Sequence, residues 1–142
     1  MYIVGNVYVA LNHLKVFPLH QKATFHMQVE ANDDAELIVI VKGPSTDPTV
    51  EVTGNSKTGF LAEFTPHEVG PYLISVEYNK VPISGTPYVG NSYDSSKVDV
   101  SEIPKGTVGK PLRFNIDCSK AGKIYFVLFS IFLLIVDINH CT

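Results

Sequence analysis

Residues of the types that carry catalysis are scattered through this chain of 142 and form no familiar catalytic arrangement. Serine, histidine and aspartate all occur, but no Gly-x-Ser-x-Gly elbow is present to hold a nucleophile. Asp33 and Asp34 follow Ala31 and Asn32, and such a run is typical of a turn rather than of a catalytic pair. We therefore expect no enzyme.

The histidines do not predict a metal site. The chain contains His13, His20, His26, His67 and His140. His20 and His26 are near each other in sequence, but no third ligand is spaced to join them, whereas zinc sites need three or four protein ligands. We expect exposed strand and loop histidines, with no metal and no other cofactor.

The stretch GNSKTG at residues 54–59 has a superficial likeness to a phosphate-binding loop. Such a loop needs Gly-Lys-Ser/Thr at its end and a helix after it. Here Phe60 opens an alternating run of apolar residues, so we predict a hairpin turn.

Composition narrows the class of protein. The net charge is -3 and lysines and arginines are not clustered, which argues against a nucleic-acid surface. The only cysteines are Cys118 and Cys141, there is no Cys-x-x-Cys, and no Asn-x-Ser/Thr sequon occurs. These features fit a reducing interior compartment. The N-terminus lacks the basic region and the apolar block of a signal peptide.

The elements that would position a site are short strands separated by turn signals about every 8–12 residues. Residues 23–30 (ATFHMQVE) alternate with period two, so one set of side chains faces a core. That set is Ala23, Phe25, Met27 and Val29. Further strands are predicted at residues 37–41 (LIVIV), 49–53, 60–65, 72–78 and 86–89. No amphipathic helix is found, and the strands together predict a β-sandwich.

The opening of the sandwich recurs later in the chain. KPLRFNIDC at residues 110–118 aligns with QKATFHMQV at residues 21–29, so Phe114 follows Phe25 by 89 residues. That is the period of one sandwich. We predict an atypical N-terminal segment (1–18), one repeat (19–92), the truncated start of a second (93–122) and an apolar tail (123–142). Residues 91–96 are expected to form a polar linker.

The motifs, taken in order, resemble the immunoglobulin-like repeat of filamins, the actin cross-linking proteins. They are VKGPS (41–45), GFLAEFTP (59–66), GPYLISV (70–76) and ISGTPY (83–88), followed by SKVDV (96–100) and GTVGKP (106–111) in the second repeat. The resemblance implies an all-β, immunoglobulin-like antiparallel β-sandwich. Residues 1–18 do not match the first strand of the family.

The resemblance also implies a function. It indicates a non-catalytic scaffold fragment of a cytoplasmic, cytoskeletal actin cross-linker. The family's actin-binding domain is absent from this sequence, so the actin cytoskeleton would be reached through the full-length protein. Other implied partners are receptor cytoplasmic-tail peptides and neighbouring filamin repeats, with no nucleic acid.

In the filamin family a groove between two strands accepts extended peptides by β-strand addition. Carried over by position, its lining is Leu37, Ile38, Val39, Ile40, Val41, Val50 and Val52. Ile38 and Ile40 are expected to point outward, and Val50 and Val52 to share that exposed side. In the alternative, the isoleucines fill the groove or pack against a neighbouring repeat. Val98 and Val100, in the first strand of the next repeat, are candidate covers.

The tail leaves three interpretations open. Residues 124–136 are apolar except for Ser130, but as a helix they span about 20 Å, while a bilayer core needs about 30 Å. The stretch is therefore a buried strand replacing the missing part of repeat two, a short membrane anchor, or translated intron sequence, because Gly122-Lys123 can be encoded by a splice-donor sequence. A genuine anchor would favour the alternative function, a membrane-tethered immunoglobulin-like surface protein.

Overall fold

The computed structural model describes residues 6–10, 15–30, 36–123 and 134–139. These residues form strands, one 3-10 turn (η1, Ser95–Lys97) and no α-helix. The strands of the sandwich are β1 (Asn6–Ala10), β2 (Val16–Pro18), β3 (Ala23–Glu30), β4 (Leu37–Lys42), β5 (Val50–Asn55), β6 (Gly59–Phe64), β7 (Gly70–Tyr78), β8 (Val81–Pro82) and β9 (Tyr88–Tyr93). The expected all-β immunoglobulin-like sandwich is confirmed.

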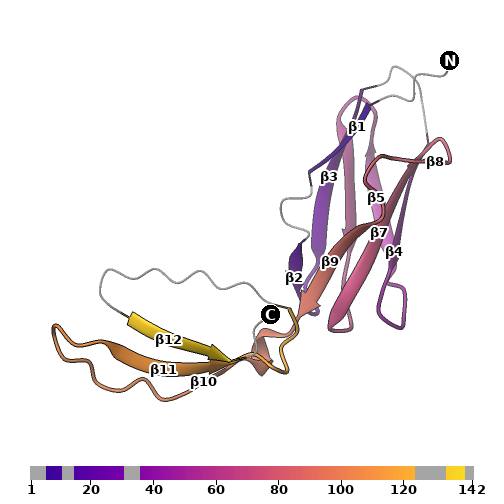
Figure 1. Cartoon of the computed structure of the whole chain (residues 1–142). Helices are drawn as coiled ribbons and strands as arrows, with labels where there is room; N and C mark the ends of the chain where they lie inside the picture. Colours follow the sequence, from indigo (N-terminus) through magenta and orange to yellow (C-terminus); the bar gives the residue numbers. More distant parts are fainter. Residues whose placement is uncertain (1–5, 11–14, 31–35, 124–133, 140–142) are drawn as a thin grey trace.

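Two sheets face each other in the sandwich (Figure 1). One has the order β1-β3-β6-β5, and the other has the order β2-β9-β7-β4 with β8 paired to β7. All pairs are antiparallel except β2 with β9, which is parallel. Residues 1–18, set apart in the sequence analysis, thus contribute β1 to one sheet and β2 to the other.

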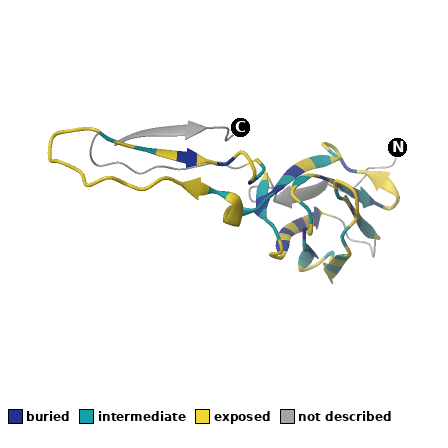
Figure 2. Ribbon diagram, turned by 90° about the horizontal axis from the view of Figure 1, so that it is seen from below, coloured by how far each residue is buried: buried dark blue, intermediate teal, exposed yellow. Residues whose placement is uncertain are grey.

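The core lies between the sheets, and its side chains come from alternating positions. In β3 the inward set predicted from the sequence is buried and the intervening residues are exposed. Bands of buried and exposed residues are visible along strands of the sandwich in Figure 2. At one end of the core Phe17, Phe64 and Tyr72 meet, with ring centroids 5.4 Å apart for Phe17–Phe64 and 5.5 Å for Phe17–Tyr72. Aromatic pairs with this edge-to-face geometry are stabilising beyond their burial.

The turns follow from local chemistry. In the loop of residues 54–59, the Asn55 side chain accepts from the N–H groups of Lys57 (2.9 Å) and Thr58 (3.0 Å). The loop joins β5 to β6, so the hairpin prediction is confirmed. Asn79 and Lys80, both at positive φ, form the two-residue turn between β7 and β8.

One turn is fixed by a tyrosine. The Tyr72 hydroxyl accepts from the Glu68 N–H and donates to the Glu68 carbonyl, both at 3.1 Å. Such a tyrosine corner is a recurrent device of immunoglobulin-like sandwiches. It ties the start of β7 to the loop before it.

The linker expected at residues 91–96 is wrong in its first half. Asn91, Ser92 and Tyr93 continue β9, where they pair with β2 and β7, and Ser92 is fully buried. The reason is that β2 offers the backbone of these residues a second hydrogen-bonding neighbour beside β7. Backbone groups of polar residues form such ladders as readily as those of apolar residues.

A second, smaller sheet extends from the end of β9 (Figure 1). It contains β10 (Asp99–Val100), β11 (Leu112–Asp117) and β12 (Leu134–Asn139), and β12 runs parallel to β11. Residues 134–139 of the tail thus lie in a strand beside β11. No helix in the described part of the chain is long and apolar enough to cross a membrane.

Candidate docking edge at strand β4

Strand β4 lies at the edge of its sheet. Among the strands that the structure describes, it pairs with β7 alone, from Leu37 opposite Tyr78 to Lys42 opposite Leu73. Its other side lies near β5, an edge strand of the opposite sheet. An edge strand presents a row of backbone donors and acceptors that a further strand can use.

The register shows which backbone groups face outward. The Asn79 N–H donates to the Glu36 carbonyl (2.9 Å), and the Glu36 N–H donates to Asn79 Oδ1 (3.2 Å), so both groups of Glu36 point toward β7. Backbone direction alternates along an antiparallel strand. The N–H and C=O groups of Leu37, Val39 and Val41 therefore point to the open edge.

The row of open groups ends at Gly43. The Gly43 N–H, next in the outward series, donates to the Asp47 carboxylate at 3.2 Å. A Cβ at Gly43 would lie 2.0 Å from the Thr46 carbonyl oxygen, so the chain turns away sharply at this point. Residues 37–41 are consequently the part of the edge open to another strand.

Side-chain directions in β4 agree with the sequence analysis. Val39 and Val41 belong to the core, and Leu37 packs against it. Ile38 is half-buried and Ile40 is 41% exposed, both on the outer face of the sheet. The isoleucines therefore do not close the sandwich interior.

The expectation for Val50 and Val52 is wrong. They lie opposite the buried Phe64 and Ala62, share their inward face and pack against the core, instead of sharing the exposed side of Ile38 and Ile40. The physical reason is that β5 belongs to the opposite sheet, so its inward face points back toward β4 across the interior. Both valines remain half-buried, because β5 is also an edge strand.

The candidate covers do not lie on β4. Val98 packs against Ile116, Cys118 and Ala121 in the second unit, and Val100 pairs with Ile116 in the β10–β11 ladder. That cover hypothesis is therefore wrong. Within the described residues, this start of the second repeat builds its own small core.

The outer face beside β4 carries a group of apolar residues that the sequence analysis did not predict to lie together. Leu73 (40% exposed) lies between Lys42 and Val89 (56% exposed) in one row across β4, β7 and β9. Ile40 lies one step along β4 on the same face. The strand alternation places each residue outward, but only the register brings them together.

The loop after β4 is held by a carboxylate. Glu68 accepts from the hydroxyls of Ser45 and Thr46 and from the Thr46 N–H (3.0 Å). The Ser45 hydroxyl, followed by that of Thr46, holds the pKa of Glu68 below its ordinary value. This contact fixes the loop that contains Asp47, and with it the end of the open edge.

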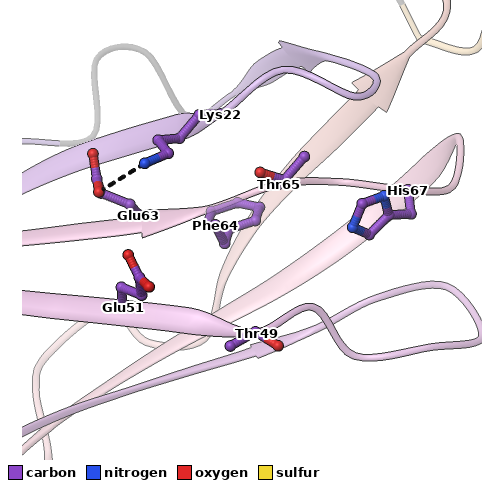
Figure 3. A pocket seen from close by; sticks show the side chains of 7 residues that line it. All are labelled: Lys22, Thr49, Glu51, Glu63, Phe64, Thr65 and His67. Carbon is purple, nitrogen blue, oxygen red and sulfur yellow. Dashed lines mark hydrogen bonds and ion pairs between the residues drawn. The ribbon is translucent and has the colours of Figure 1, made fainter.

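A separate hollow lies on the outer face of the other sheet (Figure 3). Its volume is about 280 Å³, and its lining is Lys22, Thr49, Glu51, Glu63, Phe64, Thr65 and His67. Lys22 Nζ lies 3.1 Å from Glu63 Oε2, and Glu51 lies directly opposite Glu63 in the β5–β6 ladder. One ammonium thus pairs with one of two neighbouring carboxylates.

Two of the histidines lie near each other in the fold. The rings of His20 and His67 are 5.9 Å apart, yet within the described ranges no three His, Cys, Asp or Glu side chains are grouped to hold a metal. His26 lies exposed on β3. Cys118 is buried and disulfide-bonded, a pairing that the sequence analysis did not predict.

The fold and the edge define a class of protein, the immunoglobulin-like repeat with an open edge strand. The family model described as Filamin/ABP280 repeat matches residues 3–89. The chain belongs to the filamin repeat family.

Individual relatives agree with that assignment. Filamin-A of Drosophila melanogaster is 25% identical over 118 residues, which is 79% of this chain. Filamin-C of Mus musculus is 32% identical over 112 residues, which is 70% of this chain. The matches span only 5% and 4% of these relatives.

A solved structure shows the same fold. The crystal structure of the Lin-41 filamin domain superposes with a TM-score of 0.55 at 18% identity, covering 63% of this chain and 93% of that domain.

Proposed function

We propose that this chain is a non-catalytic scaffold segment whose complete repeat separates its neighbours and docks an extended peptide at the edge of β4. One observation carries the docking proposal: the N–H and C=O groups of Leu37, Val39 and Val41 face outward on a strand whose described pairing is with β7 alone. A peptide added there continues the sheet. Membership of the filamin repeat family supports the scaffold role.

The expected affinity is weak. Three donors and three acceptors are open, and each new backbone hydrogen bond contributes a net free energy of about 1 kcal/mol. The loss of translational and rotational freedom on association offsets much of this gain. Dissociation constants of roughly micromolar or weaker follow.

The proposal includes the organisation of the chain. Residues 19–92 form the repeat together with β1 and β2 from residues 1–18, residues 93–122 begin a second repeat, and residues 123–142 form the tail. Within a longer filamin-type protein, such repeats would serve the actin cytoskeleton in the cytoplasm. Receptor cytoplasmic tails and neighbouring repeats are the proposed partners.

The test is an NMR titration of the isotope-labelled full chain with an extended apolar peptide. Backbone addition predicts shifts of the Leu37, Val39 and Val41 amides. Two N-methylated versions of the peptide keep every side chain and serve as matched controls. Methylating the alternate amides that face β4 should abolish binding, and methylating the other set should not. Equal binding of both versions, or shifts elsewhere only, would refute docking at this edge.

A further inference from the structure

We propose that the β4 edge selects a strand that is apolar on both faces and oppositely charged at its two ends. This inference rests on the docking function proposed above and specifies its ligand. An ordinary surface strand alternates apolar and polar side chains, because one face meets the core and the other meets water. The two sides of the β4 edge depart from that rule.

The outer side of the edge is apolar. A docked strand directs every second side chain to the outer face, directly beside Ile38 and Ile40. Ile40 is 41% exposed and Ile38 is half-buried, so both still have surface to cover. Covering apolar surface is favourable in proportion to its area. A polar ligand side chain at these positions would lack this favourable contribution to the free energy of binding.

The inner side is apolar as well. The remaining ligand side chains point toward the space between the two edge strands. Leu37 of β4 and Val50 and Val52 of β5 border that space, and all three are half-buried against the core. Ligand residues on this side therefore also contact apolar side chains.

The ends of the edge differ in charge. Lys42 lies at one end, exposed, and the one ion pair among the described residues joins Lys22 to Glu63. At the other end Glu36 is exposed, and Glu77 lies opposite Ile38 on the outer face. A ligand with an acidic residue beside Lys42 and a basic residue beside Glu36 complements both ends.

The open groups set the length of the ligand. Glu36 directs its N–H and C=O toward β7 and the Gly43 N–H is satisfied by Asp47, so the open groups lie within residues 37–41, five of the six residues of β4. The ligand class is thus a segment of about five apolar residues that begins with a basic residue beside Glu36, ends with an acidic residue beside Lys42 and pairs parallel to β4.

The experiment compares peptides on the full chain by NMR titration. The probes are capped heptapeptides: Lys-Val-Leu-Val-Leu-Val-Glu, the same sequence with both leucines replaced by threonine, and the same sequence with glutamine at both ends. We expect the first to bind at least about tenfold more tightly than the threonine peptide, since two apolar side chains cover Ile38 and Ile40. We expect the glutamine peptide to bind more weakly than the first, with less sensitivity to salt.

Two protein variants localise the effect. Ile40→Thr should remove most of the preference for leucine over threonine. Leu73→Thr is the matched control, because Leu73 is 40% exposed on the same face but one strand away from the edge. It should leave the preference unchanged. Both positions are exposed, and dispersed amide spectra check that each variant is folded.

The outcomes separate the ligand from the docking function. Equal affinities of the leucine and threonine peptides, with shifts at Leu37, Val39 and Val41, would overturn the two-faced ligand and leave edge docking intact. Shifts confined to Leu73 and Val89 would show binding to the sheet face and overturn both. Absence of any shift would likewise overturn both. A preference that survives Ile40→Thr would overturn the assignment of the outer face.

Discussion

A pair of proline substitutions tests the direction of the β4 amides. The register directs the Val39 N–H to the open edge and the Ile40 N–H to the Ser75 carbonyl of β7. Proline removes the N–H and is tolerated in sheets only where that group faces away from the ladder. Val39→Pro should therefore preserve the β4–β7 pairing, and Ile40→Pro should break it. If burial alone decided the outcome, Val39→Pro would be the more damaging substitution, because Val39 is 9% exposed and Ile40 is 41% exposed.

Alanine variants isolate the backbone contribution. Val39→Ala should lower the free energy of unfolding by about 1–2 kcal/mol through lost packing, and Ile40→Ala should lower it by less than about 1 kcal/mol because the side chain is exposed. Relative to alanine, proline at residue 40 removes a ladder bond and leaves a carbonyl without its donor, which costs a further ~1–3 kcal/mol. Relative to alanine, proline at residue 39 should cost close to nothing.

The measurement is urea unfolding followed by far-ultraviolet circular dichroism, since the chain has no tryptophan. The quantity compared is the proline-minus-alanine difference at each position. A difference at residue 39 as large as that at residue 40 would refute the assignment of outward groups. It would also remove the basis for strand addition at Leu37, Val39 and Val41.

Three further predictions follow from contacts elsewhere. Tyr72→Phe should lower the free energy of unfolding by about 1–3 kcal/mol, measured by urea unfolding, because Glu68 loses a partner for its N–H and its carbonyl. Glu51→Lys should raise stability by about 0.2–1 kcal/mol in the same assay, because a carboxylate opposite Glu63 becomes an ammonium. Since the folded-state pKa of Glu68 is lowered, its stabilising contribution is present above the ordinary pKa of 4.5 and is lost as the pH falls through the folded value. Glu68→Gln should therefore lose less stability on acidification than the parent chain.

Each of these has a contradicting result. Unchanged stability of Tyr72→Phe would mean that water replaces the hydroxyl. Thr53→Lys is the control for Glu51→Lys, since Thr53 lies opposite Leu61, and an equal gain there would point to net charge as the cause. If the parent chain and Glu68→Gln respond identically to acid, the hydroxyl contacts of Glu68 do not hold its carboxylate in the folded state.

The sequence is sufficient for features that repeat with a fixed period. The alternation in residues 23–30 predicts which side chains of β3 are buried, because successive strand residues face opposite sides. The Gly, Asn and Lys content of residues 54–59 predicts their hairpin for a similarly local reason.

Features that depend on a partner strand could not be obtained in this way. Val50 and Val52 alternate clearly, but alternation does not tell which face meets the core until the neighbour of β5 is known. The three-residue strand β2 is too short to have a period, and its parallel pairing with β9 has no local signal. Nor can composition tell which amides of β4 are open, since that depends on the register with β7.

The parallel pairing of β2 and β9 governs how the repeat responds to tension. The chain enters β2 beside Asn91 and leaves β9 beside Pro18, so the two strands are pulled in opposite directions along a common axis. The bonds from the Leu19 N–H to Tyr93 (2.7 Å) and from the Asn91 N–H to Lys15 (3.0 Å) are then sheared together, whereas an antiparallel pair would open one bond at a time. Phe17, 3% exposed, would have to leave the core before the strands could slide. A three-residue strand that the sequence analysis did not predict would therefore contribute to the resistance of the repeat to force.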